Sequence, residues 1–297
     1  MQHLLAIRDL DDRQIDSILE AASELSRTGR TKLERRRFSA GLLFLSSSLR
    51  TRAGFAEATI RLGGVPIDMS DVRWDPDMSA AESFEDTLRT VSGMVDIVVV
   101  RAPVDLSSRQ VADSAATTIV CGGDLRSHPT QALIDVFAIE QLRGPIEAQR
   151  LAICGDLTMR ATRSLLEYLD RRPPSKLILI TPESRRSHGV SLGPVLQERT
   201  SFRTLDDLEG IDVLSMCGLA PKLGDDHLDD AERAEFVLDP VRLRTLPSDA
   251  IVLSPMPVID EIAPEARLDR RVRLFEQSDL SVAVRMAVLD QLLVTSD

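Results

Sequence analysis

The sequence of 297 residues has almost no lysine and few aromatic side chains. Nearly every positive charge is an arginine, because lysine occurs only at Lys32, Lys176 and Lys222. Arginine is the cation suited to two-point binding of phosphate and carboxylate groups. Any anion-binding site in this protein must therefore be built from arginine.

The cysteines and the apolar segments argue against three kinds of protein. Cys121, Cys154 and Cys217 are an odd and scattered set, which fits neither a disulfide framework nor a zinc site. No apolar run approaches the roughly 20 residues needed to span a bilayer, so a membrane protein is not expected. The first residues lack a basic segment followed by an apolar one, and we therefore expect a cytoplasmic protein.

The net charge is −11, with 43% hydrophobic and 28% charged residues. This mixture and length are typical of a folded protein with two domains of ordinary size. The acidic balance argues against nucleic acid as a partner, because such proteins usually carry a basic surplus. The glycine-rich nucleotide-binding motifs, the serine-hydrolase elbow and the zinc-peptidase helix are also absent from the sequence.

Helical and strand-like patterns alternate along the first half of the chain. Helices are expected near residues 12–27, 51–62 and 83–94, with strands at residues 41–45 and in the β-branched segment VDIVVVRAP. This alternation is typical of an α/β protein whose parallel sheet is flanked by helices on both faces.

A domain boundary is expected where the next helix, which opens near His128, stops at Gly144. Beyond it the alternation restarts with four strand patterns, RLAICGDL, SKLILITP, IDVLSMCG and AIVLSPMP. We therefore predict two domains, residues 1–140 and 148–280, each a parallel sheet flanked by helices, and a last helix at 281–294 that packs back on the first domain.

The segment LFLSSSLRTRAGF places hydroxyl groups and arginines between a strand and a helix. Ser48 is a candidate N-cap, so free backbone N–H groups and the positive end of the helix dipole would face one point. Arg50, Thr51 and Arg52 add forked donors and a hydroxyl, which suit a phosphate monoester or a diacid. The alternative is a capped helix with two arginines in solvent, and this segment alone favours neither.

Two other segments place polar residues where a ligand could bind. Arg101 ends a buried strand, at the edge where open α/β sheets bind their ligands, although an arginine leaving the core for solvent is the simpler alternative. In HPTQALID, His128 and Gln131 lie about one helical turn apart and could face one cleft. Taken alone, His128 is more often a capping or packing residue.

These motifs together resemble the aspartate/ornithine carbamoyltransferase family. SLRTR resembles the family's Ser-Thr-Arg-Thr-Arg motif, VVVRAP its buried-strand arginine, and HPTQ its His-Pro-x-Gln motif. Near the C-terminus, SPMPVIDEI and FEQSDLSVAVRMAVLDQLL are similar to segments of the aspartate branch. The likeness runs from about residue 3 to residue 294, with the motifs in family order, and it implies the family's two-domain α/β fold.

The resemblance implies attack by a neutral amine on the carbonyl carbon of carbamoyl phosphate, through a tetrahedral oxyanion that expels phosphate. It implies no metal or organic cofactor. The implied catalytic residues are Arg50, Thr51, Arg101 and His128. The implied carbamoyl-phosphate site consists of Ser48, Arg50, Thr51, Arg101, His128, Gln131, Pro255 and Met256, the last two through their backbone carbonyls.

By the same resemblance, Ser48, Arg50, Thr51 and Arg101 would hold the phosphate, and Thr51, Arg101 and His128 would polarise the carbonyl. Arg52 would have a structural role. The family also implies a homotrimer, in which a loop of the neighbouring chain completes each active site and domain closure brings the acceptor onto carbamoyl phosphate.

The acceptor half departs from the aspartate carbamoyltransferase pattern. In the loop SDVRWDPDMSAAES, Pro76 and Ala80 replace a serine and a catalytic lysine, and Trp74 would line a new acceptor pocket. Arg160 matches the family's arginine that binds the acceptor's α-carboxylate, provided that the comparison allows a gap of one residue just before it. Four further positions lose the family's polar side chains, namely Gly218, Ala220, Ser254 and Val258.

Three functions remain open from the sequence. The first is carbamoyl transfer to an altered, amino-acid-like amine. The second is a catalytically silent homologue that acts as a binding or scaffold subunit. The third is a genuine aspartate carbamoyltransferase, which would need Arg73, Arg89 or another residue in place of the lysine.

Overall fold

The chain forms two compact units in its computed structural model. Unit 1 comprises Met1–Leu133 and Leu280–Asp297, and unit 2 comprises Ile134–Asp279. The structure describes residues 2–28, 37–69, 83–107, 109–186, 191–219 and 228–294. None of the helices within these ranges is long and apolar enough to cross a membrane.

Unit 1 is built on a four-stranded parallel sheet in the order β2-β1-β3-β4. The central strand β3 is buried along its whole length, as expected for a β-branched run in a sheet that helices cover on both faces. The strands of this sheet are β1 (Ser39–Phe44), β2 (Val65–Asp68), β3 (Ile97–Arg101) and β4 (Thr118–Cys121).

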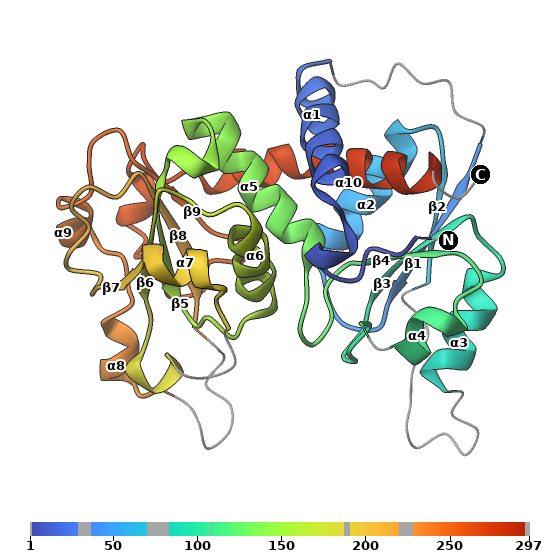
Figure 1. Cartoon of the computed structure of the whole chain (residues 1–297), viewed down its shortest axis with the longest axis horizontal. Coiled ribbons are helices and arrows are strands. Elements are labelled where there is room, and N and C mark those ends of the chain that lie inside the picture. Colours follow the sequence, from blue (N-terminus) through green and yellow to red (C-terminus); the bar gives the residue numbers. More distant parts are fainter. Residues whose placement is uncertain are drawn as a thin grey trace. The chain divides into compact units, whose positions relative to one another are not determined.

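Helices cover the two faces of this sheet. In Figure 1, α1 and α2 lie on one side of the sheet, and α3 and α4 lie on the other. Most of α10 (Leu274–Val294), from Leu280 onward, also belongs to unit 1. The helices of this unit are η1 (Ile7–Asp9), α1 (Asp12–Thr28), α2 (Leu49–Arg61), α3 (Phe84–Ser92), α4 (Arg109–Ser114) and the end of α10 (Leu274–Val294).

A buried arginine holds α10 against α2. The Arg285 guanidinium lies 5.5 Å from the centroid of the Phe55 ring and donates to Ser281 Oγ at 2.6 Å. A side chain at Gly54 would collide with this guanidinium, so glycine permits the close approach. Burial lowers the pKa of Arg285 to about 10. The contact fixes α2 one turn beyond Thr51, which is a predicted site residue.

Unit 2 is built on a five-stranded parallel sheet in the order β7-β6-β5-β8-β9. Its strands are β5 (Arg150–Gly155), β6 (Lys176–Ile180), β7 (Thr200–Phe202), β8 (Val213–Gly218) and β9 (Ile251–Leu253). Its own helices are η2 (Ile146–Ala148), α6 (Arg160–Arg171), η3 (Glu183–Arg185), α7 (Pro194–Arg199), α8 (Asp230–Ala234), α9 (Pro240–Leu243) and η4 (Ala266–Leu268).

These two sheets confirm the predicted α/β class with parallel strands and flanking helices. The division between the units falls after Leu133, inside α5 (Pro129–Arg143), whereas the sequence pattern breaks only where that helix ends. The last helix begins at Leu274, before the predicted start at residue 281. Its first turns are rich in polar residues, which hides the helical period in the sequence.

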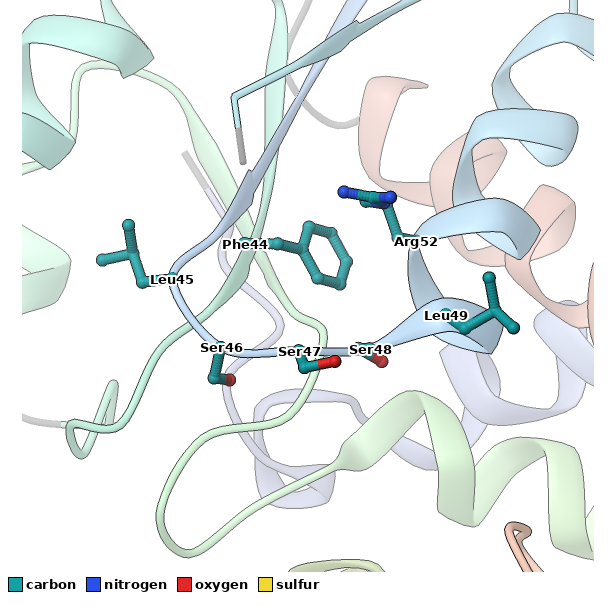
Figure 2. Close-up of a pocket in the computed structure, with 7 residues that line it drawn as sticks. All are labelled: Phe44, Leu45, Ser46, Ser47, Ser48, Leu49 and Arg52. Carbon is teal, nitrogen blue, oxygen red and sulfur yellow. The ribbon is translucent and has the colours of Figure 1, made fainter. Parts of the chain in front are cut away.

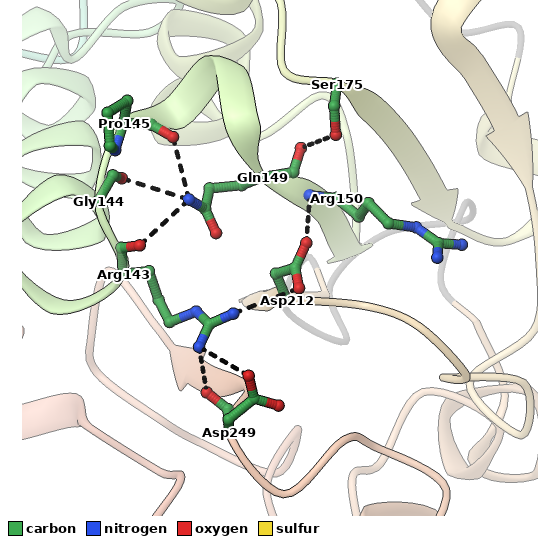
Figure 3. A network of polar contacts seen from close by, with 8 residues as sticks. All are labelled: Arg143, Gly144, Pro145, Gln149, Arg150, Ser175, Asp212 and Asp249. Carbon is green, nitrogen blue, oxygen red and sulfur yellow. Dashed lines mark hydrogen bonds and ion pairs between the residues drawn. The ribbon is translucent and has the colours of Figure 1, made fainter.

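The C-terminal end of α5 is anchored at the amino ends of the unit 2 strands (Figure 3). Arg143 donates to Asp212 Oδ1 at 3.3 Å and to the Asp249 carbonyl at 2.7 Å, just before β8 and β9. The hydrogen bond from Arg143 also lowers the pKa of Asp249. Gln149 Nε2 donates to the three carbonyls that end the helix, those of Arg143, Gly144 and Pro145.

Candidate functional site

The sheet of unit 1 has a topological switch point between β1 and β3, where successive strands are added on opposite sides of β1. The chain adds β2 on one side of β1, and then adds β3 and β4 on the other side. In an open parallel sheet, the loops at the carboxyl ends part at this point and leave a crevice for ligands. The backbone N–H of Leu45, after β1, donates to the carbonyl of Arg101, at the end of β3, at 2.8 Å. Two of the predicted segments therefore meet at the crevice.

A pocket of about 430 Å³ lies along the loop from β1 to α2 (Figure 2). Ser48 is the N-cap of α2 and has an extended backbone, but its hydroxyl accepts no capping hydrogen bond from the described first turn. That hydroxyl and the N–H groups of the first turn are therefore available to an anion. The pocket is lined by Phe44, Leu45, Ser46, Ser47, Ser48, Leu49 and Arg52.

The two arginines of this segment have different surroundings. Arg52 lines the pocket and lies 3.6 Å from an Asp68 oxygen, with both side chains about half exposed. Arg50 is half-buried and has no ion-pair partner among the residues that the structure describes. An exposed pair such as Arg52–Asp68 contributes little stability. Arg50 is therefore the stronger candidate for anion binding, and Arg52 already has a protein partner.

Three of the predicted residues meet around two glycines that follow β4. A Cβ atom at Gly123 would lie 2.6 Å from Arg101 Nη1 and 3.1 Å from His128 Cδ2. A Cβ atom at Gly122 would lie 3.4 Å from Thr51 Cγ2. Arg101 Nη1 also donates to the Gly122 carbonyl at 3.1 Å. The absence of side chains at both positions lets the threonine, the arginine and the histidine approach one another.

These three side chains are removed from water. Thr51 is 5% exposed, Arg101 9% and His128 6%. A guanidinium in such surroundings acts on an anion more strongly than it would in water, because the local dielectric constant is lower. The arrangement can bind an anion and stabilise negative charge that develops on a neighbouring oxygen.

His128 and Gln131 lie at the beginning of α5. His128 directly precedes Pro129, the first helical residue, and its backbone carbonyl accepts from the Gln131 N–H at 3.0 Å. The imidazole Nδ1 lies 3.4 Å from Thr130 Oγ1, while Nε2 is on the side that faces Gly123. Gln131 is half-buried in the first turn.

The sequence patterns do not single out Asp124, which organises the loop before His128. Asp124 is fully buried, and its Oδ1 accepts the backbone N–H groups of Arg126 at 2.7 Å and of Ser127 at 2.5 Å. Its Oδ2 accepts the Leu106 N–H at 2.9 Å. The Gly-Gly-Asp run directly after an apolar strand is the sequence signal that could have revealed this loop.

The remaining predicted residues belong to unit 2. Pro255 and Met256 follow β9, and Met256 has a φ of 53°, the single positive value of a non-glycine residue among the described ones. Arg160 is half-buried and is the first residue of α6.

Two of the described acceptor positions, Gly218 and Val258, carry no charge. Gly218 ends β8 with a φ of 75°, and a Cβ atom there would lie 3.5 Å from the carboxyl carbon of Glu261. Val258 packs against the apolar core of unit 2. Arg89, a candidate to replace the lysine, is exposed on α3. Five further residues lie outside the described part of the chain, namely Arg73, Trp74, Pro76, Ala80 and Ala220.

No group of three or more potential metal-ligating side chains occurs within the described ranges. A model of the family "Aspartate/ornithine carbamoyltransferase, carbamoyl-P binding domain" matches residues 2–141. The aspartate carbamoyltransferase catalytic subunit of Archaeoglobus fulgidus is 31% identical, over 99% of this chain and 100% of that protein. The chain belongs to the aspartate/ornithine carbamoyltransferase family.

Solved structures of this family have the same fold. The catalytic subunit of M. jannaschii aspartate transcarbamoylase has a TM-score of 0.83 and 28% identity, covering 99% of each chain. Aspartate transcarbamoylase from Trypanosoma cruzi, in complex with carbamoyl aspartate and phosphate, has a TM-score of 0.84 and 25% identity. It covers 97% of this chain and 94% of that one. The resemblance read from the motifs is confirmed at the level of the carbamoyltransferase family.

Proposed function

We propose that this carbamoyltransferase family member moves the carbamoyl group of carbamoyl phosphate to the amine of an amino-acid-like acceptor, with an acceptor site that differs from that of aspartate carbamoyltransferases. One observation carries the donor half of the proposal. Thr51, Arg101 and His128 meet around Gly122 and Gly123, at the strand switch point and beside the free first turn of α2.

In the proposed reaction, Ser48, Arg50 and the first turn of α2 bind the phosphate group. The amine nitrogen attacks the carbonyl carbon, and the carbonyl electron pair moves onto oxygen. Arg101 and His128 stabilise this oxyanion, assisted by the Thr51 hydroxyl. When the carbonyl re-forms, the bond from carbon to the bridging oxygen breaks and phosphate leaves with that electron pair. The attacking nitrogen transfers one proton to the departing phosphate.

The acceptor half of the proposal follows from the charges in unit 2. Arg160 is the cation proposed to bind the α-carboxylate of the acceptor. Gly218 and Val258 offer no cation for a second carboxylate, and the carboxyl group of Glu261 lies next to Gly218. These surroundings favour an acceptor without the second carboxylate of aspartate, with Trp74 proposed as part of its pocket.

Each alternative has an observation in its favour. Similarity to aspartate carbamoyltransferase catalytic subunits over the whole chain favours aspartate as the acceptor. Ala80, Gly218 and Val258 stand where the family has a catalytic lysine and acceptor-binding arginines. Their loss favours a catalytically silent homologue that acts as a binding or scaffold subunit. A homotrimer is proposed in all three cases.

Phosphate release from carbamoyl phosphate, measured with a panel of amines that includes aspartate, tests the proposal. We expect turnover with an amine other than aspartate, and calorimetry should detect binding of carbamoyl phosphate alone. Arg101→Ala should lower the rate by about 10²- to 10³-fold, because it removes a preorganised donor. Arg61→Ala is the matched control, since Arg61 is exposed on α2 and pairs with Glu57.

The outcomes separate the alternatives. Turnover with aspartate alone would support a genuine aspartate carbamoyltransferase. Binding of carbamoyl phosphate without turnover of any amine would support the silent homologue. No binding of carbamoyl phosphate would contradict the donor site itself.

A further inference from the structure

Gln277 is a buried amide that joins two helices and a loop of unit 2. Its Nε2 donates to Asp135 Oδ1, on α5, at 2.6 Å. Its Oε1 accepts the backbone N–H of Ser254, directly after β9, at 2.9 Å. The exposed fractions are 2% for Gln277, 3% for Asp135 and 2% for Ser254. We propose that Asp135 and Gln277 are positioning residues, which hold residues 254–256 in the conformation that binds the carbamoyl group.

The loop needs such support because its backbone adopts an unfavourable conformation. Met256 has a φ of 53°, in the left-handed region, which is unfavourable for a residue with a side chain. Its N–H donates to Ser254 Oγ at 3.2 Å, and Ser254 is held in turn by Gln277. On the other side of the loop, Glu261 Oε2 accepts the Ile259 N–H at 2.9 Å. The conformation of Met256 therefore depends on a chain of hydrogen bonds that begins at Asp135.

The chemistry of the network accounts for a glutamine at position 277. The side chain must donate on one side and accept on the other, and a primary amide does both. Asp135 accepts and cannot donate when ionised, so it fixes the amide with its oxygen toward Ser254. Asp135 also lies one turn beyond Gln131 on the same helix, and Gln131 is a predicted carbamoyl-binding residue. One network therefore supports α5 and the loop together.

This inference rests on the proposed function, in which the backbone carbonyls of Pro255 and Met256 accept hydrogen bonds from the carbamoyl NH₂ group. Inorganic phosphate has no such group. A change in the network should therefore weaken the binding of carbamoyl phosphate and leave the binding of inorganic phosphate unchanged. A general loss of structure would weaken both.

Gln277→Glu is the most direct test, because it keeps the shape of the side chain and exchanges the donor for a carboxylate oxygen. That oxygen would face Asp135 Oδ1, and at a pH where both groups are ionised the two carboxylates repel each other and the hydrogen bond is lost. We expect the Kd of carbamoyl phosphate, measured by calorimetry, to rise about 10- to 100-fold, as for other misplaced binding groups. The Kd of inorganic phosphate should stay within about twofold, since its proposed ligands lie on α2 and β3.

The combination of Asp135→Asn with Gln277→Glu is the rescue variant. It exchanges the two functional groups, so the new amide can donate to the new carboxylate, and the carboxylate can still accept from the Ser254 N–H. The net charge of the pair stays the same. We expect the Kd of carbamoyl phosphate to return to within about threefold of the original value, as a coupled pair requires.

Gln291→Glu is the matched control on the same helix. Gln291 Oε1 accepts from Ser17 Oγ at 3.2 Å, and a carboxylate can accept the same hydrogen bond. This variant should therefore bind both anions normally. If Gln277→Glu does not fold, Ser254→Ala replaces it, because this change removes only the hydroxyl that accepts from the Met256 N–H.

Three results would overturn the positioning role. The first is an unchanged ratio of the Kd of carbamoyl phosphate to the Kd of inorganic phosphate in Gln277→Glu. The second is the same unchanged ratio in Ser254→Ala, where that variant replaces Gln277→Glu. The third is a rescue variant that binds carbamoyl phosphate no better than Gln277→Glu. A parent protein that shows no preference for carbamoyl phosphate over phosphate would overturn the proposed function, and this inference with it. Because this comparison uses only the parent protein, a failure of the proposed function is detected before any variant is measured.

Discussion

Gly123 must be a glycine for two reasons, its backbone conformation and its close contact with Arg101. Its φ is 109°, and a Cβ atom would lie 2.6 Å from Arg101 Nη1. Gly123→Ala should therefore displace the guanidinium and the neighbouring His128 ring. We expect the affinity for inorganic phosphate, measured by calorimetry, to fall at least about tenfold, because a displaced preorganised donor costs that much or more.

Gly63→Ala separates the backbone effect from the effect on the site. Gly63 has a φ of 82°, and no atom lies within 4 Å of a Cβ atom placed there. Both variants should lose about 1–2 kcal/mol of unfolding free energy for the left-handed backbone. Equal phosphate affinity in the two variants would show that Gly123 does not shape an anion site.

The cysteines at the ends of β5 and β8 should be unreactive in the folded protein. Burial raises the pKa of the Cys217 thiol to about 12 and also raises that of Cys154. Cys217 Sγ donates to the Cys154 carbonyl at 3.1 Å, and Cys121 is buried as well. Because the thiolate is the reactive form, we expect no reaction with Ellman's reagent between pH 7 and 9. All three thiols should react in guanidinium chloride.

The same raised pKa predicts the direction of a pH effect on stability. The folded state keeps the Cys217 thiol protonated at a pH where the unfolded chain, with a pKa of about 8.5, loses the proton. The stabilising contribution is therefore complete below the unfolded value and is lost as the pH rises toward 12. Urea unfolding should show a smaller fall in stability between pH 8 and pH 10 in Cys217→Ala than in the parent. An identical fall would contradict this assignment.

At the scale of elements, Gln149 holds the end of α5 (Figure 3). It is 5% exposed, and its Nε2 donates to the carbonyls of Arg143, Gly144 and Pro145. Gln149→Met keeps most of the volume and leaves these carbonyls without their donor. We expect the unfolding free energy of unit 2 to fall by about 1–3 kcal/mol, measured by denaturant unfolding.

The exposed Gln197 on α7 provides the control for this change. Gln197→Met should stay within about 0.5 kcal/mol of the parent, as surface substitutions usually do. Phosphate binding should be unaffected in both variants, because the network lies at the amino ends of the unit 2 strands. A loss of phosphate affinity in Gln149→Met would mean that this end of α5 also supports the anion site.

The sequence predicts those elements whose apolar pattern is strong. β3 and β8 are buried along their whole length, and both coincide with predicted strands. β2 is mostly exposed and β7 has only three residues, so neither has a periodic apolar signal. The residues of the proposed donor half are predicted from their motifs, whereas the sequence analysis does not name Gly122, Asp124 and Gln277. Their roles depend on contacts between segments that are distant in the sequence.

At the scale of the whole molecule, both units place their predicted residues at the carboxyl ends of parallel strands. In unit 1 these ends carry Thr51, Arg101 and His128 close together, so the proposed oxyanion-binding side chains of the donor half lie within one unit of one chain. The proposed acceptor half includes Trp74, in the loop that the family resemblance assigns to the active site of a neighbouring chain. The two halves can therefore be tested separately in a mixed oligomer.

Complementation between two inactive variants is the last prediction. Arg101→Ala removes the donor half, and Trp74→Ala removes a proposed part of the acceptor half. If each active site takes its loop from a neighbouring chain, equal mixing after dissociation and reassembly restores both halves in about a quarter of the sites, because subunits assort at random in a symmetric oligomer. Carbamoyl transfer should then reappear in the mixture, although neither variant alone supports it. A mixture as inactive as its components would place both halves in the same chain, and full activity of Trp74→Ala alone would exclude Trp74 from the site. Light scattering on the same samples would show whether the chains had assembled as trimers.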